Sequence, residues 1–162
     1  KTRKGRSSGR PLATKKSMHL VLRSSKARGD FSFKTAKNSK AINQIVAKFS
    51  HKYGVQIISL ANVGNHLHFH IQLSKIRLYA PFIRAVTSAI AMAVSGVNRW
   101  KKSEWDGKFW DYRPFTRVVV GFRAFLKLKD YLEVNQLEGL GLNRLQAYIL
   151  MKGKRATRPL LC

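Results

Sequence analysis

Histidines alternate along one short segment of this sequence, Gly64-Asn65-His66-Leu67-His68-Phe69-His70. In an extended strand successive side chains point to opposite faces, so His66, His68 and His70 are expected on the same face. Imidazoles two residues apart can reach one metal ion, which makes His66 and His68 candidate ligands. His70 lies further along the strand and is a candidate helper that lines the site or contacts phosphate. The spacing alone leaves an ordinary structural role for these histidines equally open.

The residues that alternate with these histidines are uniformly apolar. Leu67, Phe69, Ile71 and Leu73 share the opposite face of the same segment. A strand with this pattern buries its apolar face in a core and leaves its polar face on the other side of a sheet. We therefore predict a sheet whose second face carries imidazoles.

A second group of reactive side chains is spaced for a helix. Lys127, Tyr131 and Asn135 lie four residues apart and so share one helical face. A tyrosine there can attack a phosphodiester, and Asn135 can turn its amide oxygen toward the same metal. Helix periodicity by itself favours a structural role, in which Tyr131 borders an apolar stripe made of Phe122, Phe125, Leu126, Leu128 and Leu132.

Charge narrows the class of partner. The 162 residues include 32 Lys and Arg against 7 Asp and Glu, a formal net charge of +25. Such an imbalance is typical of nucleic-acid-binding proteins, with an anionic membrane surface as the competing partner. The longest apolar stretch, 78–94, contains Arg84 and is short for a bilayer span, so no membrane partner is expected. The basic start does not resemble a signal peptide, which predicts a cytoplasmic protein.

Scarce residue types exclude other chemistries. The single cysteine, Cys162, rules out an intrachain disulfide and a cysteine-based zinc cluster. Two-metal nucleases use clustered carboxylates to hold ions about 3.5–4 Å apart, whereas the acidic residues here are scattered. A metal in this protein would therefore depend mainly on imidazoles and an amide.

Regular elements are predicted in the order strand, helix, strand, strand, helix, strand, helix. The strands are expected at 17–24, 55–63, 66–74 and 109–120. The helices are expected from a cap at Asn38 or Ser39 to 53, at 81–96 and at 122–137. This order predicts an α+β fold, a ferredoxin-like (RRM-like) antiparallel sheet with helices on one face, an open other face and a C-terminal helix that carries the tyrosine.

The chain divides into a basic flexible arm (1–16), one domain (17–140) and a short helix with a basic tail (141–162). The arm and the loop that precedes the fourth strand are predicted to bind DNA, because cations track phosphates and aromatic rings stack on unpaired bases. For the two tryptophans, packing in the core or loop is the competing role. The predicted DNA-binding residues are Arg3, Lys4, Arg6, Arg10, Lys15, Lys16, Arg99, Trp100, Lys101, Lys102 and Trp105.

The histidine pair and the tyrosine helix together resemble a known group of enzymes. Asn65-His66-Leu67-His68 after a hairpin turn resembles the histidine-hydrophobe-histidine motif of the HUH superfamily of single-strand DNA nucleases. The segment 131–140, YLEVNQLEGL, is similar to the tyrosine helix of single-tyrosine transposases, in particular the REP-associated branch, where an asparagine follows four residues after the tyrosine. Phe109-Trp110-Asp111-Tyr112 resembles the aromatic strand entry before that helix. Gln136-Leu137 departs from the Pro-Val of many relatives.

The resemblance implies both a mechanism and a set of roles. His66, His68 and Asn135 would hold one divalent ion, magnesium or manganese, beside the scissile phosphate. Tyr131 would attack, giving a 5′-phosphotyrosine link and a free 3′-hydroxyl that can reverse the step. The implied partner is single-stranded or hairpin DNA in the bacterial cytoplasm, at the nucleoid.

Two further residues of this helix are candidate helpers. A free tyrosine has a pKa near 10 and must be activated by its surroundings. Lys127, one turn upstream, is the candidate electrostatic helper, with a DNA phosphate contact or a solvated surface charge as equally open roles. Gln136 is also an amide, but its position five residues after Tyr131 makes it a weaker choice of ligand than Asn135.

Other functions stay open on the sequence alone. Replication initiators of the superfamily usually carry a lysine three residues after the tyrosine, where this chain has Val134, and relaxases usually place their tyrosine near the N-terminus, whereas the first tyrosine here is Tyr53. A non-catalytic nucleic-acid-binding domain would explain the charge but would leave the histidine and tyrosine patterns as coincidence. The sequence is compatible with a monomer or a homodimer.

Overall fold

A four-stranded antiparallel sheet forms the centre of the molecule. The computed structural model describes residues 11–97 and 107–156. The sheet has the order β2-β3-β1-β4, with strands β1 (Met18–Arg23), β2 (Val55–Asn62), β3 (His66–Leu73) and β4 (Phe115–Val118). The helices are α1 (Ala36–Tyr53), α2 (Tyr79–Ser95), α3 (Phe122–Gly139) and α4 (Arg144–Ala156), with two short 3₁₀ helices, η1 (Gly29–Phe31) and η2 (Ile76–Leu78). The predicted α+β, ferredoxin-like class and element order are confirmed.

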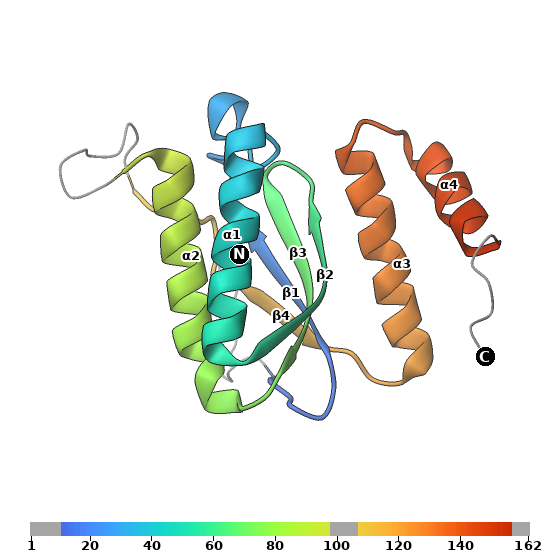
Figure 1. The fold of residues 1–162 in the computed structure, drawn as a ribbon, viewed down its shortest axis with the longest axis horizontal. Helices are drawn as coiled ribbons and strands as arrows, with labels where there is room; N and C mark the ends of the chain where they lie inside the picture. The colour runs from blue at the N-terminus through green and yellow to red at the C-terminus, as the bar shows by residue number, and fades with distance from the viewer. Residues whose placement is uncertain (1–10, 98–106, 157–162) are drawn as a thin grey trace, which may run out of the picture.

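The helices lie in layers on both sides of the sheet. Figure 1 shows α1 and α2 side by side on one face, α3 on the opposite face and α4 outside α3. The prediction of an open second face is therefore wrong, because α3 runs along β2 and β3 there. The periodicity of 122–137 shows that one side of this helix is apolar, but it does not show which face of the sheet receives it.

The main core lies between the sheet and the first two helices. Leu67, Phe69 and Ile71 of β3 are completely buried, and Leu73 is 2% exposed, so the predicted apolar face of this strand is confirmed. Each such side chain contributes about 1.5–3 kcal/mol by leaving water. Partners on the other elements of this core include Met18, Leu20, Ile42, Val46, Phe82, Val86 and Ile90.

The most apolar helical segment belongs to this core. The helical stretch Ile76–Ser95 is by length and composition apolar enough to cross a membrane. Its residues Phe82, Val86 and Ile90 are completely buried in the cluster that also contains the β1 and β3 side chains. One side of this helix therefore packs on the core.

Helix α1 begins earlier than the sequence predicts. Thr35, not Asn38 or Ser39, is the N-cap, and its side chain accepts a hydrogen bond from the backbone N–H of Asn38. Asn38 is buried instead, and its amide donates to the carbonyls of Asp30 (3.0 Å) and Ser32 (2.9 Å). The amide thus fixes the loop that leads into the helix, because a buried polar side chain must find partners.

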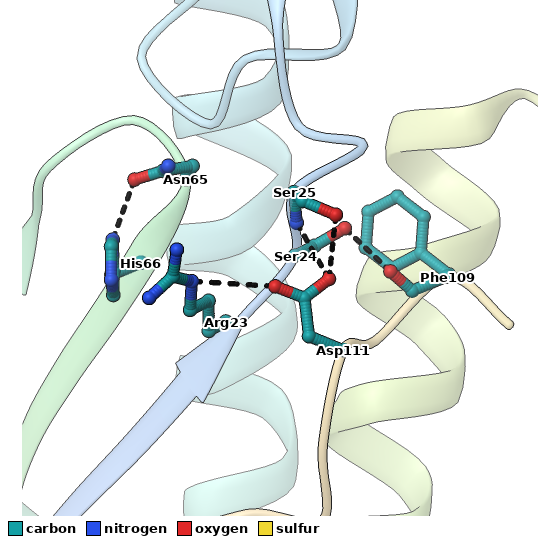
Figure 2. Close-up of polar contacts among 7 residues, drawn as sticks. All are labelled: Arg23, Ser24, Ser25, Asn65, His66, Phe109 and Asp111. Atoms are coloured by element: carbon teal, nitrogen blue, oxygen red, sulfur yellow. Dashed lines mark hydrogen bonds and ion pairs between the residues drawn. The ribbon is translucent and has the colours of Figure 1, made fainter.

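The fourth strand is much shorter than the predicted 109–120. Figure 2 shows why: the Asp111 carboxylate turns back to the end of β1, where it accepts from the Ser25 N–H and hydroxyl at 2.8 Å each. The Asp111 N–H donates to the Arg23 carbonyl at 3.0 Å. Pro114 has no N–H to offer a ladder, and the strand begins directly after it. Phe109 and Trp110 consequently pack against the main core from a non-strand segment.

Helix α4 packs on α3 through a second, smaller core. Val134 and Leu137 of α3 contact Ala147 and Met151 of α4. The start of α4 is closed by reciprocal hydrogen bonds between Asn143 and Gln146, of 2.9 and 3.1 Å, the arrangement of a capping box. The predicted division of the chain at 16 and 140 stays a prediction, although Leu12, within the predicted arm, packs against the main core.

Candidate active site

Strand pairing assembles the polar face of the sheet. The β1–β3 register places His19 opposite His70, Val21 opposite His68 and Arg23 opposite His66. The rings of His66 and His68 are nearly parallel, with centroids 5.8 Å apart and an interplanar angle of 12°. His19 stacks on the other side of His68, at 5.5 Å and 18°. Three imidazoles therefore form a row across two strands.

Each of the two candidate ligands is held through the same ring nitrogen. Nδ1 of His66 makes a hydrogen bond with Oδ1 of Asn65. Nδ1 of His68 lies 3.3 Å from Nε2 of His19. When Nδ1–H is the donor in both contacts, Nε2 of both rings keeps its lone pair, which is the form that binds a metal. Asn65 and His19 can thus orient the two imidazoles.

Tyr131 of α3 lies edge-on to this row. Its ring centroid is 5.7 Å from that of His68 and 6.0 Å from that of His19, at interplanar angles of 83° and 74°. The side chain is 41% exposed, so a substrate can reach it. Tyr131 follows His68 by 63 residues in the sequence, so the fold brings two distant motifs together within one chain.

The other predicted residues of α3 differ in their surroundings. The Asn135 amide donates to the Tyr131 carbonyl at 2.6 Å, so its nitrogen is engaged and its oxygen Oδ1 is the atom left for a ligand. Lys127 is exposed and lines the same pocket as Tyr131. Gln136 is exposed and lines different pockets, beside Leu140. This agrees with its expected direction away from Tyr131.

His70 lies at the closed end of the histidine strand. It is completely buried, its Nε2 lies 2.7 Å from the Ser17 hydroxyl, and its ring packs at 4.7 Å on Phe125 of α3. Burial, and then Lys129, lower the pKa of His70. A neutral, enclosed imidazole of this kind joins the sheet to α3, while its predicted part as a helper stays a prediction.

The imidazoles of the row resist protonation. Burial, followed by the charges of neighbouring histidines, lowers the pKa of His68 to about 4, and burial together with His70 and Arg117 lowers that of His19 to about 4. Burial and Arg23 also lower the pKa of His66, partly opposed by Asp111. Neutral imidazoles at physiological pH are the state that a metal ion requires.

An ion pair borders the outer end of the site, beside His66. Arg23, the cross-strand partner of His66, places its Nε 3.3 Å from the Asp111 carboxylate. Figure 2 shows the guanidinium between His66 and Asp111. Although burial opposes it, the hydrogen bonds from Ser25 hold the pKa of Asp111 below its ordinary value, with Arg23 adding to the effect.

Sequence reasoning missed His19 and Arg23. His19 is the only polar residue within the run Met18–Leu22, and its neighbours Met18 and Leu20 are completely buried. That interruption of an apolar strand was the available signal, but its partner His68 is 49 residues away. Lys15 and Lys16 are exposed as expected for DNA contacts. The other predicted DNA-binding residues, Arg3, Lys4, Arg6, Arg10, Arg99, Trp100, Lys101, Lys102 and Trp105, lie outside the described residues.

The candidate for a third protein ligand is the amide of Asn135. Within residues 11–97 and 107–156, no three His, Cys, Asp or Glu side chains are placed to hold one metal ion. The pair His66 and His68 fits a metal by its neutral charge and its free Nε2 atoms. The Oδ1 atom of Asn135 is the predicted addition to this pair.

Two solved structures share this fold. A REP-associated tyrosine transposase bound to a REP hairpin matches with a TM-score of 0.64 and 10% identity, over 83% of this chain and 74% of the other. A Deinococcus radiodurans R1 protein assigned as a transposase matches with a TM-score of 0.50 and 18% identity, over 83% of this chain and 98% of the other. At these identities the likeness establishes the fold. No curated protein matches the sequence significantly.

The family follows from the sequence match. The family model described as "Transposase IS200 like" matches residues 13–135, which include both histidines, the tyrosine and the asparagine of the site. This match covers well over half of the 162 residues. The chain therefore belongs to the family of IS200-like transposases.

Proposed function

We propose that this transposase nicks and rejoins single-stranded DNA beside a hairpin, through a covalent 5′-phosphotyrosine bond to Tyr131. The position of Tyr131 carries the proposal: its ring lies 5.7 Å from that of His68, in the same chain. We therefore propose that the nucleophile and the imidazoles of one active site come from the same chain. The structural relative that was solved with a REP hairpin supports a hairpin as the DNA partner.

We assign a divalent ion, Mg²⁺ or Mn²⁺, to His66, His68 and Asn135. Both imidazoles are neutral at physiological pH because burial lowers their pKa. The Asn135 nitrogen is engaged by the Tyr131 carbonyl, which leaves the amide oxygen as the donor atom. When bound, such an ion offsets the charge that develops on a phosphodiester under attack.

The remaining chemistry belongs to residues of the chain. The Tyr131 hydroxyl loses its proton, its oxygen bonds to phosphorus, and the bond from phosphorus to the 3′ oxygen breaks. The released strand takes up a proton and ends in a 3′-hydroxyl. Lys127, an exposed cation in the pocket that Tyr131 lines, is assigned as the electrostatic helper that contacts the phosphate. Because one phosphodiester replaces another, the reverse attack can rejoin strands without ATP.

The test is a metal-dependent covalent adduct. The protein is mixed with a pool of hairpin-bearing single-stranded oligonucleotides, with Mn²⁺ or with a chelator, and DNA–protein bonds that survive SDS are measured. Tyr131→Phe should abolish the adduct, because it removes only the nucleophilic oxygen. Tyr112→Phe and Tyr148→Phe are the matched controls, since both side chains are exposed, at 76% and 44%, and should leave the adduct unchanged.

Each of the other outcomes would change the proposed mechanism or function. An adduct that persists in Tyr131→Phe and disappears in a control variant moves the nucleophile to that tyrosine. An adduct that forms equally well in chelator rejects the assigned metal. Salt-sensitive binding with no adduct under any condition favours a non-catalytic DNA-binding protein.

A further inference from the structure

A pocket of about 350 Å³ lies between the β4 edge of the sheet and α3. Tyr131 and His19 line it, so it shares a wall with the proposed active site. Its other lining residues include Arg117 and Val119 from the β4 segment and Ala124 and Leu128 from α3. Its volume is at the lower end of the range for small-molecule sites. A space of this size suits a single nucleotide better than a base pair.

The lining combines an apolar wall with cations at the surface. Val119 is 8% exposed, and Ala124 and Leu128 are half-buried. Arg117 and Lys127 are both exposed on the solvent side. None of the described residues that line the pocket is acidic. Apolar contact for a base or sugar, with basic groups for phosphate, is the chemistry that single-stranded nucleic acid requires.

An exposed aromatic ring stands at the same edge. Phe115 of β4 is 41% exposed, and its ring lies edge-on to His19 at 6.3 Å. Phe115 and His68 are both cross-strand partners of Val21, so they lie on the same face of the sheet. An unpaired base that leaves the pocket therefore meets a ring on which it can stack.

We infer that this pocket binds one unpaired nucleotide next to the phosphodiester that Tyr131 attacks. The inference rests on the proposed function, because a phosphodiester at the Tyr131 hydroxyl places its neighbouring nucleotide within reach of a cavity that the same side chain lines. Arg117 and Lys127 then hold the flanking phosphate. Val119, Ala124 and Leu128 contact the base or the sugar.

The test compares DNA with and without bases. The 162-residue protein is titrated, in chelator, with a thymidine oligonucleotide roughly 12 nucleotides long and with a base-free phosphodiester of equal length, within the usual site size for single strands. Wild type should bind the thymidine strand about 5-fold or more tightly, the lower limit expected for one stacked base. Ala124→Leu fills the pocket and should remove about 5-fold of affinity for the thymidine strand while leaving affinity for the base-free strand unchanged.

Matched variants separate the pocket from the fold and from charge. Ala47→Leu makes the same change at an exposed position of α1, on the opposite side of the sheet, and should bind both strands as wild type does. Arg117→Gln should weaken both strands equally, since it removes a phosphate contact. Circular dichroism of each variant checks that the fold is retained; if Ala124→Leu unfolds, the strand comparison is repeated with the smaller change Leu128→Ala, which should also lower the preference for bases.

The outcomes distinguish the two proposals. A normal Tyr131 adduct with an unchanged preference for bases in Ala124→Leu rejects the pocket and keeps the transposition chemistry. If Ala124→Leu loses the preference for bases but the wild type forms no adduct, the pocket is kept as a nucleotide site and the transposition chemistry is rejected. Equal loss of affinity for both strands in Ala124→Leu overturns the inference.

Discussion

The two faces of strand β3 are built from alternating residues and differ in almost every physical respect. On one face, Leu67, Phe69 and Ile71 are completely buried beneath α1 and α2. On the other face, exposure decreases along the strand from a half-exposed His66, through His68 at 8%, to a fully buried His70. The apolar face supplies stability uniformly, whereas the histidine face has an open end where a metal and DNA can enter.

The helices that cover the two faces differ in the same way. Helices α1 and α2 present apolar side chains to the core, whereas α3 buries Leu132 but leaves the adjacent Tyr131 41% exposed beside His68. One face can therefore accept polar groups that contribute little stability because the other already fixes the strand. The comparison predicts that neighbouring residues of β3 will give opposite phenotypes.

The largest expected effect is on the apolar face. Phe69→Ala should lower the free energy of unfolding by about 3–5 kcal/mol, because it leaves a cavity in a fully buried core. His68→Asn, one residue away, should change it by about 1 kcal/mol or less and should abolish the adduct. Urea denaturation followed by circular dichroism measures both. Equal destabilisation by the two variants would contradict the division of labour between the faces.

A smaller effect is expected from the histidine that orients a candidate ligand. His19→Leu removes the hydrogen-bond partner of His68 Nδ1 and should weaken Mn²⁺ binding about 10–100-fold, as loss of an outer-shell partner usually does. His19→Gln retains an acceptor oxygen and should restore most of the affinity. Electron paramagnetic resonance of free Mn²⁺ gives the affinities. If His19→Leu bound Mn²⁺ as tightly as wild type, the 3.3 Å contact between the two rings would be a packing contact that does not orient His68.

The docking of α3 on the histidine face depends on one close approach. A Cβ added at Gly139 would lie 2.7 Å from the Asn62 carbonyl of β2. Gly139→Ala should therefore cost about 1–3 kcal/mol through the clash, offset by up to about 1 kcal/mol of helix propensity. Gly153→Ala in α4, where an added Cβ has no neighbour within 4 Å, is the control. Hydrogen exchange should show faster exchange in α3 of the first variant alone.

The sequence was sufficient for the features that repeat along the chain. The period of two in 66–73 predicted both faces of β3, and the period of four in α3 placed Tyr131 and Asn135 together. These patterns are local, so they need no knowledge of neighbours. The fold class followed from the order of such elements.

The features that the sequence did not predict depend on contacts between distant segments. His19 contacts His68 only because β1 pairs with β3. A single histidine in a strand forms no periodic pattern from which this contact could be predicted. The predicted strand 109–120 is reduced to Phe115–Val118, and the Asp111 carboxylate that precedes it bonds to Ser25, 86 residues away. In both cases the role of a polar side chain depends on its tertiary partners, and hydrophobic periodicity gives no information about them.

The smallest expected effect is a pH dependence that belongs to the histidine face alone. The pKa values of His19 and His68 are about 4 in the folded protein, below the ordinary 6.5, chiefly because of burial. Above pH 6.5 both histidines are neutral in the folded and in the unfolded protein, so their contribution to the free energy of unfolding is fully present. As the pH falls from 6.5 toward 4, the unfolded chain takes up protons that the folded chain refuses, so the free energy of unfolding decreases.

After allowance for solvent screening, this loss should be on the order of 1 kcal/mol. Thermal midpoints between pH 7 and 4.5, measured in chelator, should therefore fall less steeply in the double variant His19→Gln/His68→Asn than in wild type. His51→Gln, at an exposed position of α1, is the control and should keep the wild-type slope. An unchanged slope in the double variant would mean that the carboxylates dominate the acid response. In that case the histidines would add nothing measurable to the fall of the thermal midpoint with pH, although their chemistry differs from that of the apolar face.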